Sequence, residues 1–139
     1  MNMEMFRKLV VLNEGKRNQM YKDSLGIETI GIGHNLRDKP ISDRAVYVIF
    51  EDDMAEIFPQ LDKHVPWWRD LDDARQCAIA DMAFQMGIGG LLGFRNTLAL
   101  IRAGQYTDAA VAMRESKWHT QTPARAERIA LIMETGVLS

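Results

Sequence analysis

The chain has 139 residues, 47% of them hydrophobic, so it can bury one core but is too short for two independent domains. Its formal net charge of −2 gives no reason to expect nucleic acid or an anionic membrane as the main partner. A single cysteine, Cys77, excludes an intrachain disulfide, and its apolar neighbours predict a buried side chain.

The first segment has the pattern of an amphipathic helix. Apolar residues such as Phe6 and Leu9 recur at steps of three and four, which predicts a helix over residues 2–13 with Gly15 as its C-terminal cap. Charged residues interrupt the apolar run, so we expect no signal peptide. We therefore expect the protein to be made in the cytoplasm of its host and to reach an external target by another route.

The period of the sequence changes after this helix. β-prone residues over 20–22 and 27–32 flank a turn over 23–26, whose final glycine should take a positive φ angle. Gly31 and Gly33 then alternate with isoleucines. Glycine weakens a strand, so the pattern predicts that another group approaches the backbone closely there.

Two acids and a hydroxyl surround this hairpin: Glu14 follows the helix, Asp23 opens the turn, and Thr29 lies on the next strand. Glycoside hydrolysis needs one carboxyl group that stays protonated, to donate to the leaving oxygen, and one that stays ionised. The negative end of a helix dipole disfavours an ionised carboxylate, which suits Glu14 to the first role. Taken one at a time, the three residues are equally typical of a solvated acid, a turn former and a strand former.

A long helix is predicted over about residues 42–63. Ser42 is a good N-terminal cap, and Pro59 should kink or end the helix. Asp53 interrupts the apolar stripe of this helix, where a carboxylate is costly unless another group pairs with it. His34, at the end of the glycine-rich strand, is the partner that we predict.

The rest of the sequence predicts helices only. They are expected over 71–86 with Gly87 beyond the end, over 90–103, from a cap at Thr107 to about 115, and from a cap at Thr122 to just before Gly136. The three tryptophans and the methionines on these helices are expected in the core. The histidines are not spaced with acids as metal ligands are, so we predict no metal.

Four ordered blocks carry a family resemblance: EG…MYKDSLG…TIGIGH, ISDRAVYVIFEDD, AFQMGIGGLLGFRNT and SKWHTQTPARAERI. With them the chain resembles the phage-type lysozymes, glycoside hydrolase family 24, over nearly its whole length. The resemblance implies one α+β domain over 1–139 with a lysozyme-like two-lobed fold. A small β-hairpin lobe would cover about 14–41, a connecting helix about 42–63 and a larger helical lobe 64–139, with helix 2–13 packed on that lobe.

The resemblance also implies an activity. The family hydrolyses the β-1,4 bond between N-acetylmuramic acid and N-acetylglucosamine in bacterial peptidoglycan, without a cofactor. By matching positions, Glu14 is the general acid, Asp23 the ionised partner, and Thr29 helps Asp23 to hold the attacking water. A carboxyl separation of about 6.5–9.5 Å is typical of the inverting reaction that we expect.

Further residues receive roles from the same resemblance. Substrate-binding positions fall at Asn35, Phe84, Gln85, Thr97 and Lys117, although Asn35 replaces an apolar residue and Lys117 the more usual arginine. Supporting roles fall to the pair His34–Asp53 and to Arg125, which would lie near Glu14. A cation beside Glu14 favours its ionised form, against the need for an acid. We therefore expect this pair to position Glu14 in the free enzyme.

Two departures from the family matter. The segment 35–40, between the glycine-rich strand and the long helix, is much shorter than in the best-known members, so part of the wall of the small lobe is missing. The isoelectric point of about 5.9 predicts weak electrostatic attraction to anionic cell walls.

Several functions stay open at this point. The chain is either an active muramidase, as an endolysin, a tail-associated module or a bacteriolytic toxin, or a catalytically weak peptidoglycan-binding or structural module. Non-hydrolytic transglycosylation needs only one acid, so Asp23 and Thr29 argue against it. We expect a monomer that a holin or a phage particle delivers to the wall.

Overall fold

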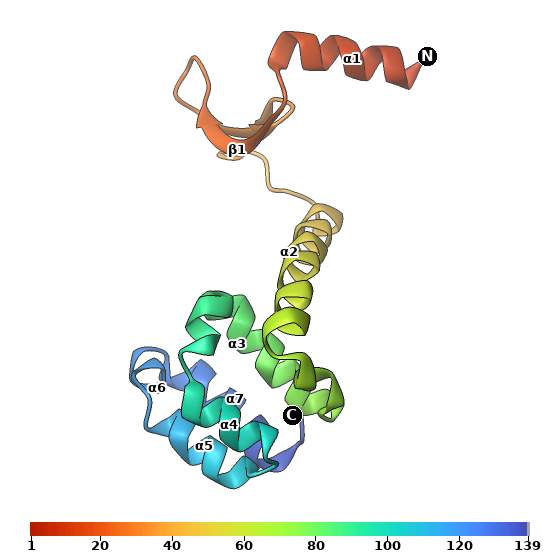
Figure 1. Ribbon diagram of the computed structural model, residues 1–139. Coiled ribbons are helices and arrows are strands. Elements are labelled where there is room, and N and C mark those ends of the chain that lie inside the picture. Colours follow the sequence, from red (N-terminus) through yellow and green to blue (C-terminus); the bar gives the residue numbers. More distant parts are fainter. Residues whose placement is uncertain (139) are drawn as a thin grey trace. The chain divides into compact units, whose positions relative to one another are not determined.

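The computed structural model describes residues 1–138, and Figure 1 shows the order of the elements. The elements are α1 (Met3–Glu14), β1 (Arg17–Lys22), β2 (Glu28–Gly31), β3 (His34–Asn35), α2 (Asp43–His64), the 3-10 helix η1 (Pro66–Asp70), α3 (Asp73–Leu92), α4 (Arg95–Arg102), α5 (Tyr106–Arg114), α6 (Lys117–Gln121) and α7 (Pro123–Thr135). This helix-rich arrangement with one small antiparallel sheet confirms the predicted α+β class and is consistent with a lysozyme-like fold.

The chain divides into two compact units. The first unit is Met1–Val48 and the second begins at Ile49, so the division falls within α2. Helix α1 belongs to the first unit together with the sheet. The predicted packing of residues 2–13 on the helical lobe would join the two units, and it stays a prediction, as do the predicted lobe boundaries.

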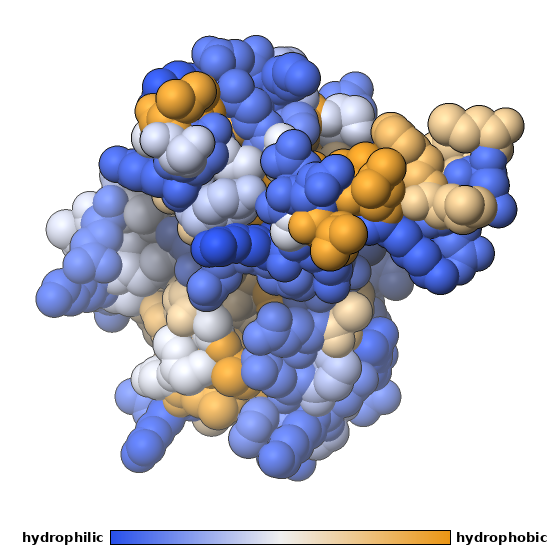
Figure 2. All heavy atoms as spheres, turned by 90° about the horizontal axis from the view of Figure 1, so that it is seen from above, coloured by the Kyte–Doolittle hydropathy of each residue, from blue (hydrophilic) through white to orange (hydrophobic). Residues whose placement is uncertain are grey.

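Helix α1 begins and ends within one residue of its prediction. The Asn2 side chain accepts a hydrogen bond from the Met5 amide at 3.1 Å, and Gly15 ends the helix with a φ of 79°. No residue of α1 is buried, and its apolar residues Met3, Phe6 and Leu9 are exposed. Figure 2 shows orange and pale orange apolar surface over α1, at the right of the view.

The sheet is three-stranded and antiparallel, in the order β1-β2-β3. Tyr21 pairs with Thr29 across the first two strands, and a bulge interrupts the pairing between Arg17 and Tyr21. Gly26 has a φ of 77°, which confirms the predicted turn. The sequence missed the early start of β1 and the short strand β3, because neither stretch alternates apolar and polar residues.

Helix α2 starts where it was predicted to start. The Ala45 amide donates to Ser42 Oγ at 3.1 Å, which confirms the cap. The helix continues to His64, so Pro59 does not end it, and the alternative prediction of a kink at Pro59 stays a prediction. Proline removes only one backbone donor from the helix. Burial of Leu61 and Val65 in the core stabilises the helical turn after Pro59 and offsets that loss.

The core lies in the second unit, where α7 packs against α3, α5 and α6. Its buried members include Trp68, Trp118, Met82 and Met113, as predicted, and all members of the core cluster lie between Leu61 and Met133. Cys77 is exposed, so its predicted burial is wrong; it precedes two buried residues of α3 but lies on the outer side of the helix. Within the described residues, no single helix is both long and apolar enough to cross a membrane.

Some predicted helix boundaries differ from the structure. Gly87 leaves the helical conformation as predicted, with a φ of 74°, but five more helical residues follow it within α3. For the helix predicted over 90–103 the end is confirmed within one residue but the start is wrong, because the chain leaves α3 at Gly93 and α4 begins at Arg95. Apolar residues line both sides of this break, so periodicity alone does not reveal it.

Two predicted caps have other roles. Gln105 precedes α5, so Thr107 lies inside that helix and does not cap it. Thr122 does precede α7, with Pro123 at the first position, but its hydroxyl donates to the Trp118 carbonyl at 3.1 Å. The sequence also missed α6, which Ser116 caps by accepting from the His119 amide.

Candidate active site

Glu14, the predicted acid, is the last residue of α1 and packs against the glycine-rich segment. A Cβ atom built on Gly33 would lie 2.9 Å from Glu14 Oε2, closer than real Cβ contacts. Gly33 also has a φ of 67°, a region that favours glycine. The predicted close approach to a glycine is therefore confirmed at Gly33, and the approaching group is the predicted acid itself.

Asp23, the predicted ionised partner, closes the turn between β1 and β2. Its Oδ1 atom accepts from the backbone amides of Leu25 at 2.8 Å and Ile27 at 2.9 Å. Backbone hydrogen bonds also join Asp23 to Gly26 and Ile27. One carboxylate oxygen is thus held by two amide dipoles, and Oδ2 receives no hydrogen bond from residues 1–138.

Thr29 is the only buried residue among residues 1–60. Its hydroxyl donates to the Ile27 carbonyl at 2.8 Å, and the amide of the same residue donates to Asp23. Ile27 therefore connects Asp23 and Thr29: its amide binds the Asp23 side chain, and its carbonyl binds the Thr29 side chain. The hydroxyl oxygen of Thr29 keeps lone pairs that can accept a hydrogen bond from a third group.

The first unit thus brings three predicted catalytic residues into one small α+β structure. Glu14 lies against Gly33, which follows β2 by two residues, while Asp23 and Thr29 are joined through Ile27 just before that strand. Acid- and base-assisted hydrolysis uses two carboxyl groups, one beside the leaving oxygen and one held in place to activate a water molecule. The separation of the two carboxyl groups stays a prediction.

His34 and Asn35 lie on β3, and both serve the loop that follows. His34 Nε2 is 3.1 Å from the Lys39 carbonyl oxygen. Asn35 Oδ1 accepts from the amides of Arg37 and Asp38, both at 3.0 Å. These contacts order the short 35–40 segment, while the predicted pairing of His34 with Asp53 and the sugar contact of Asn35 stay predictions.

Sequence reasoning missed an ion pair that spans the turn. Arg37 Nε donates to Glu28 Oε2 at 3.0 Å, and Arg37 Nη2 donates to the Gly26 carbonyl at 2.9 Å. The hydrogen bond from Arg37 lowers the pKa of Glu28, and Glu28 raises the pKa of Arg37. A negative charge on a predicted hairpin strand and a positive charge after it were the only available signal.

In the second unit, two predicted residues line one hollow. Asp53 on α2 and Phe84 on α3 surround it together with Glu56 and Gln60, and its volume is about 340 Å³. Phe84 is 42% exposed, and its ring centroid lies 5.9 Å from that of Phe50. The hollow therefore combines one exposed aromatic ring with carboxylate and amide groups, which suits a polar ligand with apolar faces.

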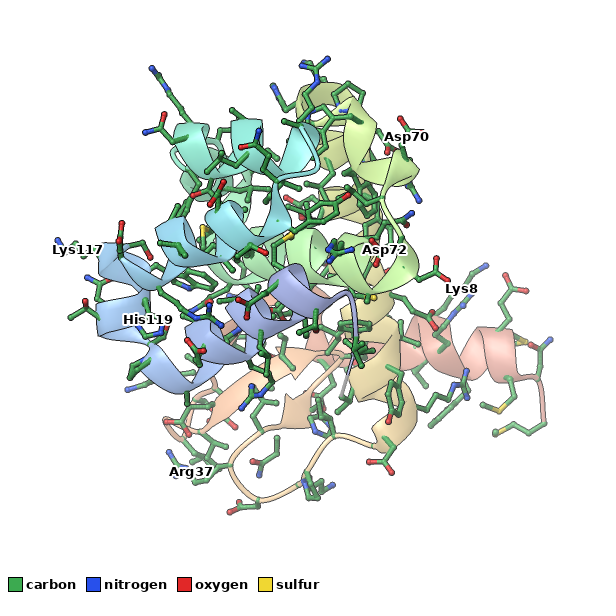
Figure 3. The ribbon with its side chains drawn as sticks, turned by 90° about the horizontal axis from the view of Figure 1, so that it is seen from below. Lys8, Arg37, Asp70, Asp72, Lys117 and His119 are labelled. Atoms are coloured by element: carbon green, nitrogen blue, oxygen red, sulfur yellow. The ribbon has the colours of Figure 1, made fainter. Side chains whose placement is uncertain are left out.

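The other predicted substrate residues have internal contacts or lie apart. Gln85 Oε1 accepts from Trp118 Nε1 at 2.9 Å, and the Gln85 amide nitrogen lies 3.5 Å from the Thr122 hydroxyl. Thr97 on α4 is only 5% exposed. Lys117 is exposed at the start of α6, on the same short helix as His119 (Figure 3). Their contacts with substrate stay predictions.

Arg125 on α7 has a partner that the sequence did not indicate. Its Nε and Nη2 atoms donate to the two carboxylate oxygens of Asp81 on α3, at 3.1 and 3.0 Å. This paired geometry ties α7 to α3 inside the second unit. The predicted proximity of Arg125 to Glu14 would join the two units and stays a prediction.

A metal site is not formed by the described side chains. No group of three or more His, Cys, Asp or Glu residues within 1–138 could hold a metal ion. The predicted independence from metals and cofactors stays a prediction.

Comparison with known proteins places the chain. A family model described as phage lysozyme matches residues 12–130. The chain is 33% identical to the pre-baseplate central spike protein Gp5 of Enterobacteria phage T4, and the match covers 97% of this chain and 28% of that protein. It is 29% identical to the probable T4-type lysozyme 1 of Dictyostelium discoideum, covering 96% of this chain and 95% of that protein.

A third relative is a longer protein. The chain is 34% identical to the peptidoglycan hydrolase gp36 of Pseudomonas phage phiKMV over 88% of this chain and 14% of that protein. The chain therefore corresponds to a part of two large phage proteins and to nearly all of a lysozyme.

Proposed function

The chain belongs to the phage lysozyme family and is a glycosidase of the lysozyme class, and from this premise we propose that it hydrolyses bacterial peptidoglycan as a muramidase. The bond cleaved is the β-1,4 bond between N-acetylmuramic acid and N-acetylglucosamine. The observation that carries the proposal is the arrangement of Glu14, Asp23 and Thr29 around the hairpin of the first unit.

In the proposed reaction, Glu14 is the general acid. Its carboxyl group donates a proton to the glycosidic oxygen as the bond to the anomeric carbon breaks. The absence of a side chain at Gly33 supports this role, because a Cβ atom there would occupy the space that the carboxyl group needs.

Asp23 is the general base. Its Oδ2 atom accepts a proton from a water molecule while that water attacks the anomeric carbon from the opposite face, which inverts the configuration. Two backbone amides that donate to Oδ1 support the role because they fix the orientation of the carboxyl group and leave Oδ2 for the water. The Thr29 hydroxyl accepts a hydrogen bond from the same water and thereby limits its orientations.

The proposed biological setting is the bacterial cell wall. The chain acts on the cell wall after synthesis in the host cytoplasm, either released by a holin at lysis or carried as part of a phage particle. It works as a monomer, because the proposed chemistry uses residues of a single first unit. Lysis and wall entry use the same reaction, and the similarity to both a lysozyme and a spike protein agrees with either setting.

The test is the loss of turbidity of Gram-negative cells whose outer membrane has been stripped. We expect the parent protein to clear the suspension and Glu14→Gln to leave it turbid. Glu4→Gln, on the exposed face of the same helix, is the matched control and should clear at the parent rate. A folded parent that binds the cells without clearing them would replace the proposal with a peptidoglycan-binding module.

A further inference from the structure

The turn that carries Asp23 has little support from packing. The residues from Ser24 to Gly26 are exposed, and the buried side chain nearest in sequence is Thr29. The backbone amides that bind Asp23 therefore depend on hydrogen bonds to keep their positions. Any group that holds the peptide segment from Leu25 to Glu28 also holds the proposed base.

Arg37 is such a group. One guanidinium group donates to three acceptors on this segment: Glu28 Oε2 at 3.0 Å, Glu28 Oε1 at 3.4 Å and the Gly26 carbonyl at 2.9 Å. Gly26 lies between Leu25 and Ile27, whose amides bind Asp23. Arg37 thus binds the turn at Gly26 and at Glu28, on either side of Ile27, whose amide orients the Asp23 carboxylate.

The base of the Arg37 side chain is fixed as well. Its own amide donates to Asn35 Oδ1 at 3.0 Å, and the Leu36 amide donates to the Glu28 carbonyl at 2.8 Å. The backbone of Arg37 therefore lies in an ordered loop, and its guanidinium group binds Glu28 on the ordered strand β2. In Figure 3, Arg37 lies in the loop that follows the sheet.

From these contacts we infer that Arg37 is a positioning residue for the proposed reaction, acting through the Gly26 carbonyl and Glu28 on the orientation of the Asp23 carboxylate. The inference rests on the proposed function. The short 35–40 segment brings this arginine back onto the hairpin, so the loop orders the base-bearing turn instead of adding wall to the lobe.

An exposed ion pair adds little to global stability. Arg37 and Glu28 are 50% and 34% exposed, and such pairs are screened by salt. The inferred effect is local: a small opening of the turn releases the two amides from Asp23, and a misplaced base lowers the rate of the chemical step. Substrate binding is not affected, so the turnover number and not KM should change.

The experiment compares Arg37→Ala with Arg69→Ala. Arg69 forms the same kind of pair with Asp62, at 2.9 and 3.2 Å and 52% exposed, in the second unit. Parent and Glu14→Gln are measured first on soluble peptidoglycan fragments, so that failure of the proposed function is recognised separately. We expect Arg37→Ala to lower kcat about tenfold with KM within about twofold, and Arg69→Ala to leave both unchanged.

Two further variants separate the contacts. Arg37→Lys can pair with Glu28 but cannot donate to the Gly26 carbonyl at the same time. Its kcat should therefore lie between those of Arg37→Ala and the parent. Glu28→Gln keeps the carbonyl contact and should lose about threefold in kcat. An unchanged kcat in Arg37→Ala, or a raised KM at constant kcat, would overturn the inference, the second outcome assigning Arg37 to substrate binding.

A measurement without substrate tests the geometry alone. Hydrogen exchange of the Leu25 and Ile27 amides should be about tenfold faster in Arg37→Ala than in the parent, with exchange in α3 unchanged. This readout stands even for an inactive parent protein. Equal protection of both amides in the two proteins would show that Arg37 does not order the turn.

Discussion

The two units of this chain divide the work between them. The first unit, residues 1–48, buries a single side chain, yet it holds the proposed acid, the proposed base and the hydroxyl. The second unit holds the whole core cluster, and its polar residues Gln85 and Arg125 are bonded to other parts of the same unit. The proposed chemistry and the stability of the fold therefore rest on different parts of the chain, which substitutions can test separately.

The largest expected effect is on the proposed base. Asp23→Asn keeps an oxygen that can accept from the Leu25 and Ile27 amides, so the turn should keep its shape while the negative charge is lost. We expect hydrolysis of peptidoglycan to fall about 10²–10⁴-fold, with the thermal unfolding midpoint unchanged. Activity near the parent level would mean that a different group takes up the proton.

The converse test removes core volume from the second unit. Met82 is fully buried on α3, so Met82→Ala should lower the free energy of unfolding by about 2–5 kcal/mol. The rate of hydrolysis per folded molecule should stay the same below the unfolding temperature. Urea unfolding measures the first quantity and initial rates the second; a large fall in the rate of the folded variant would contradict the division of work.

A cap on α2 gives a smaller effect. Ser42→Ala removes the side-chain acceptor of the Ala45 amide and should cost about 1 kcal/mol. Thr107→Ala is the matched control, because Thr107 is exposed within α5 and caps nothing. Its effect on the urea midpoint should be close to zero, and equal losses in the two variants would mean that the hydrogen bond to Ser42 is not the cause.

The smallest effect is a change in acid sensitivity. Hydrogen bonds from His119 and Arg114 hold the pKa of Glu127 below the ordinary glutamate value of 4.5. A lowered pKa in the folded state means that the pair stabilises the fold above that ordinary value and that the contribution is lost as the pH falls through the folded pKa.

Glu127→Gln should therefore lower the urea midpoint slightly at pH 6 and by less at pH of about 3. Glu115→Gln is the control, since Glu115 has no ion-pair partner among the described residues. If both variants lose the same fraction of stability with falling pH, the pairing of Glu127 does not contribute.

Local features of the fold were predictable from the sequence. The cap at Ser42, the turn at Gly26 and the approach of a group to Gly33 each depend on a few neighbouring residues. The proximity of Asp23 and Thr29 was predictable for the same reason, because the two residues are only six positions apart and flank one turn; their catalytic roles stay predictions.

Contacts between distant segments were not predictable. Arg125 meets Asp81 across 44 positions, and that pairing requires the packing of α7 on α3. The break at Gly93 depends on how residues before and after it, such as Leu91 and Phe94, pack in the core. The local sequence stays apolar on both sides and does not indicate the break. The pair Arg37–Glu28 lies on the surface, where no periodic pattern indicates which charges meet.

The central claim is that the first unit hydrolyses the glycosidic bond with Glu14 as its acid. Digestion of purified peptidoglycan by the parent and by Glu14→Gln, followed by mass spectrometry of the reduced products, tests it most directly. The account predicts muropeptides that have gained one water from the parent and no products from the variant. Anhydro-muramic products from the parent, or equal product release by Glu14→Gln, would contradict it.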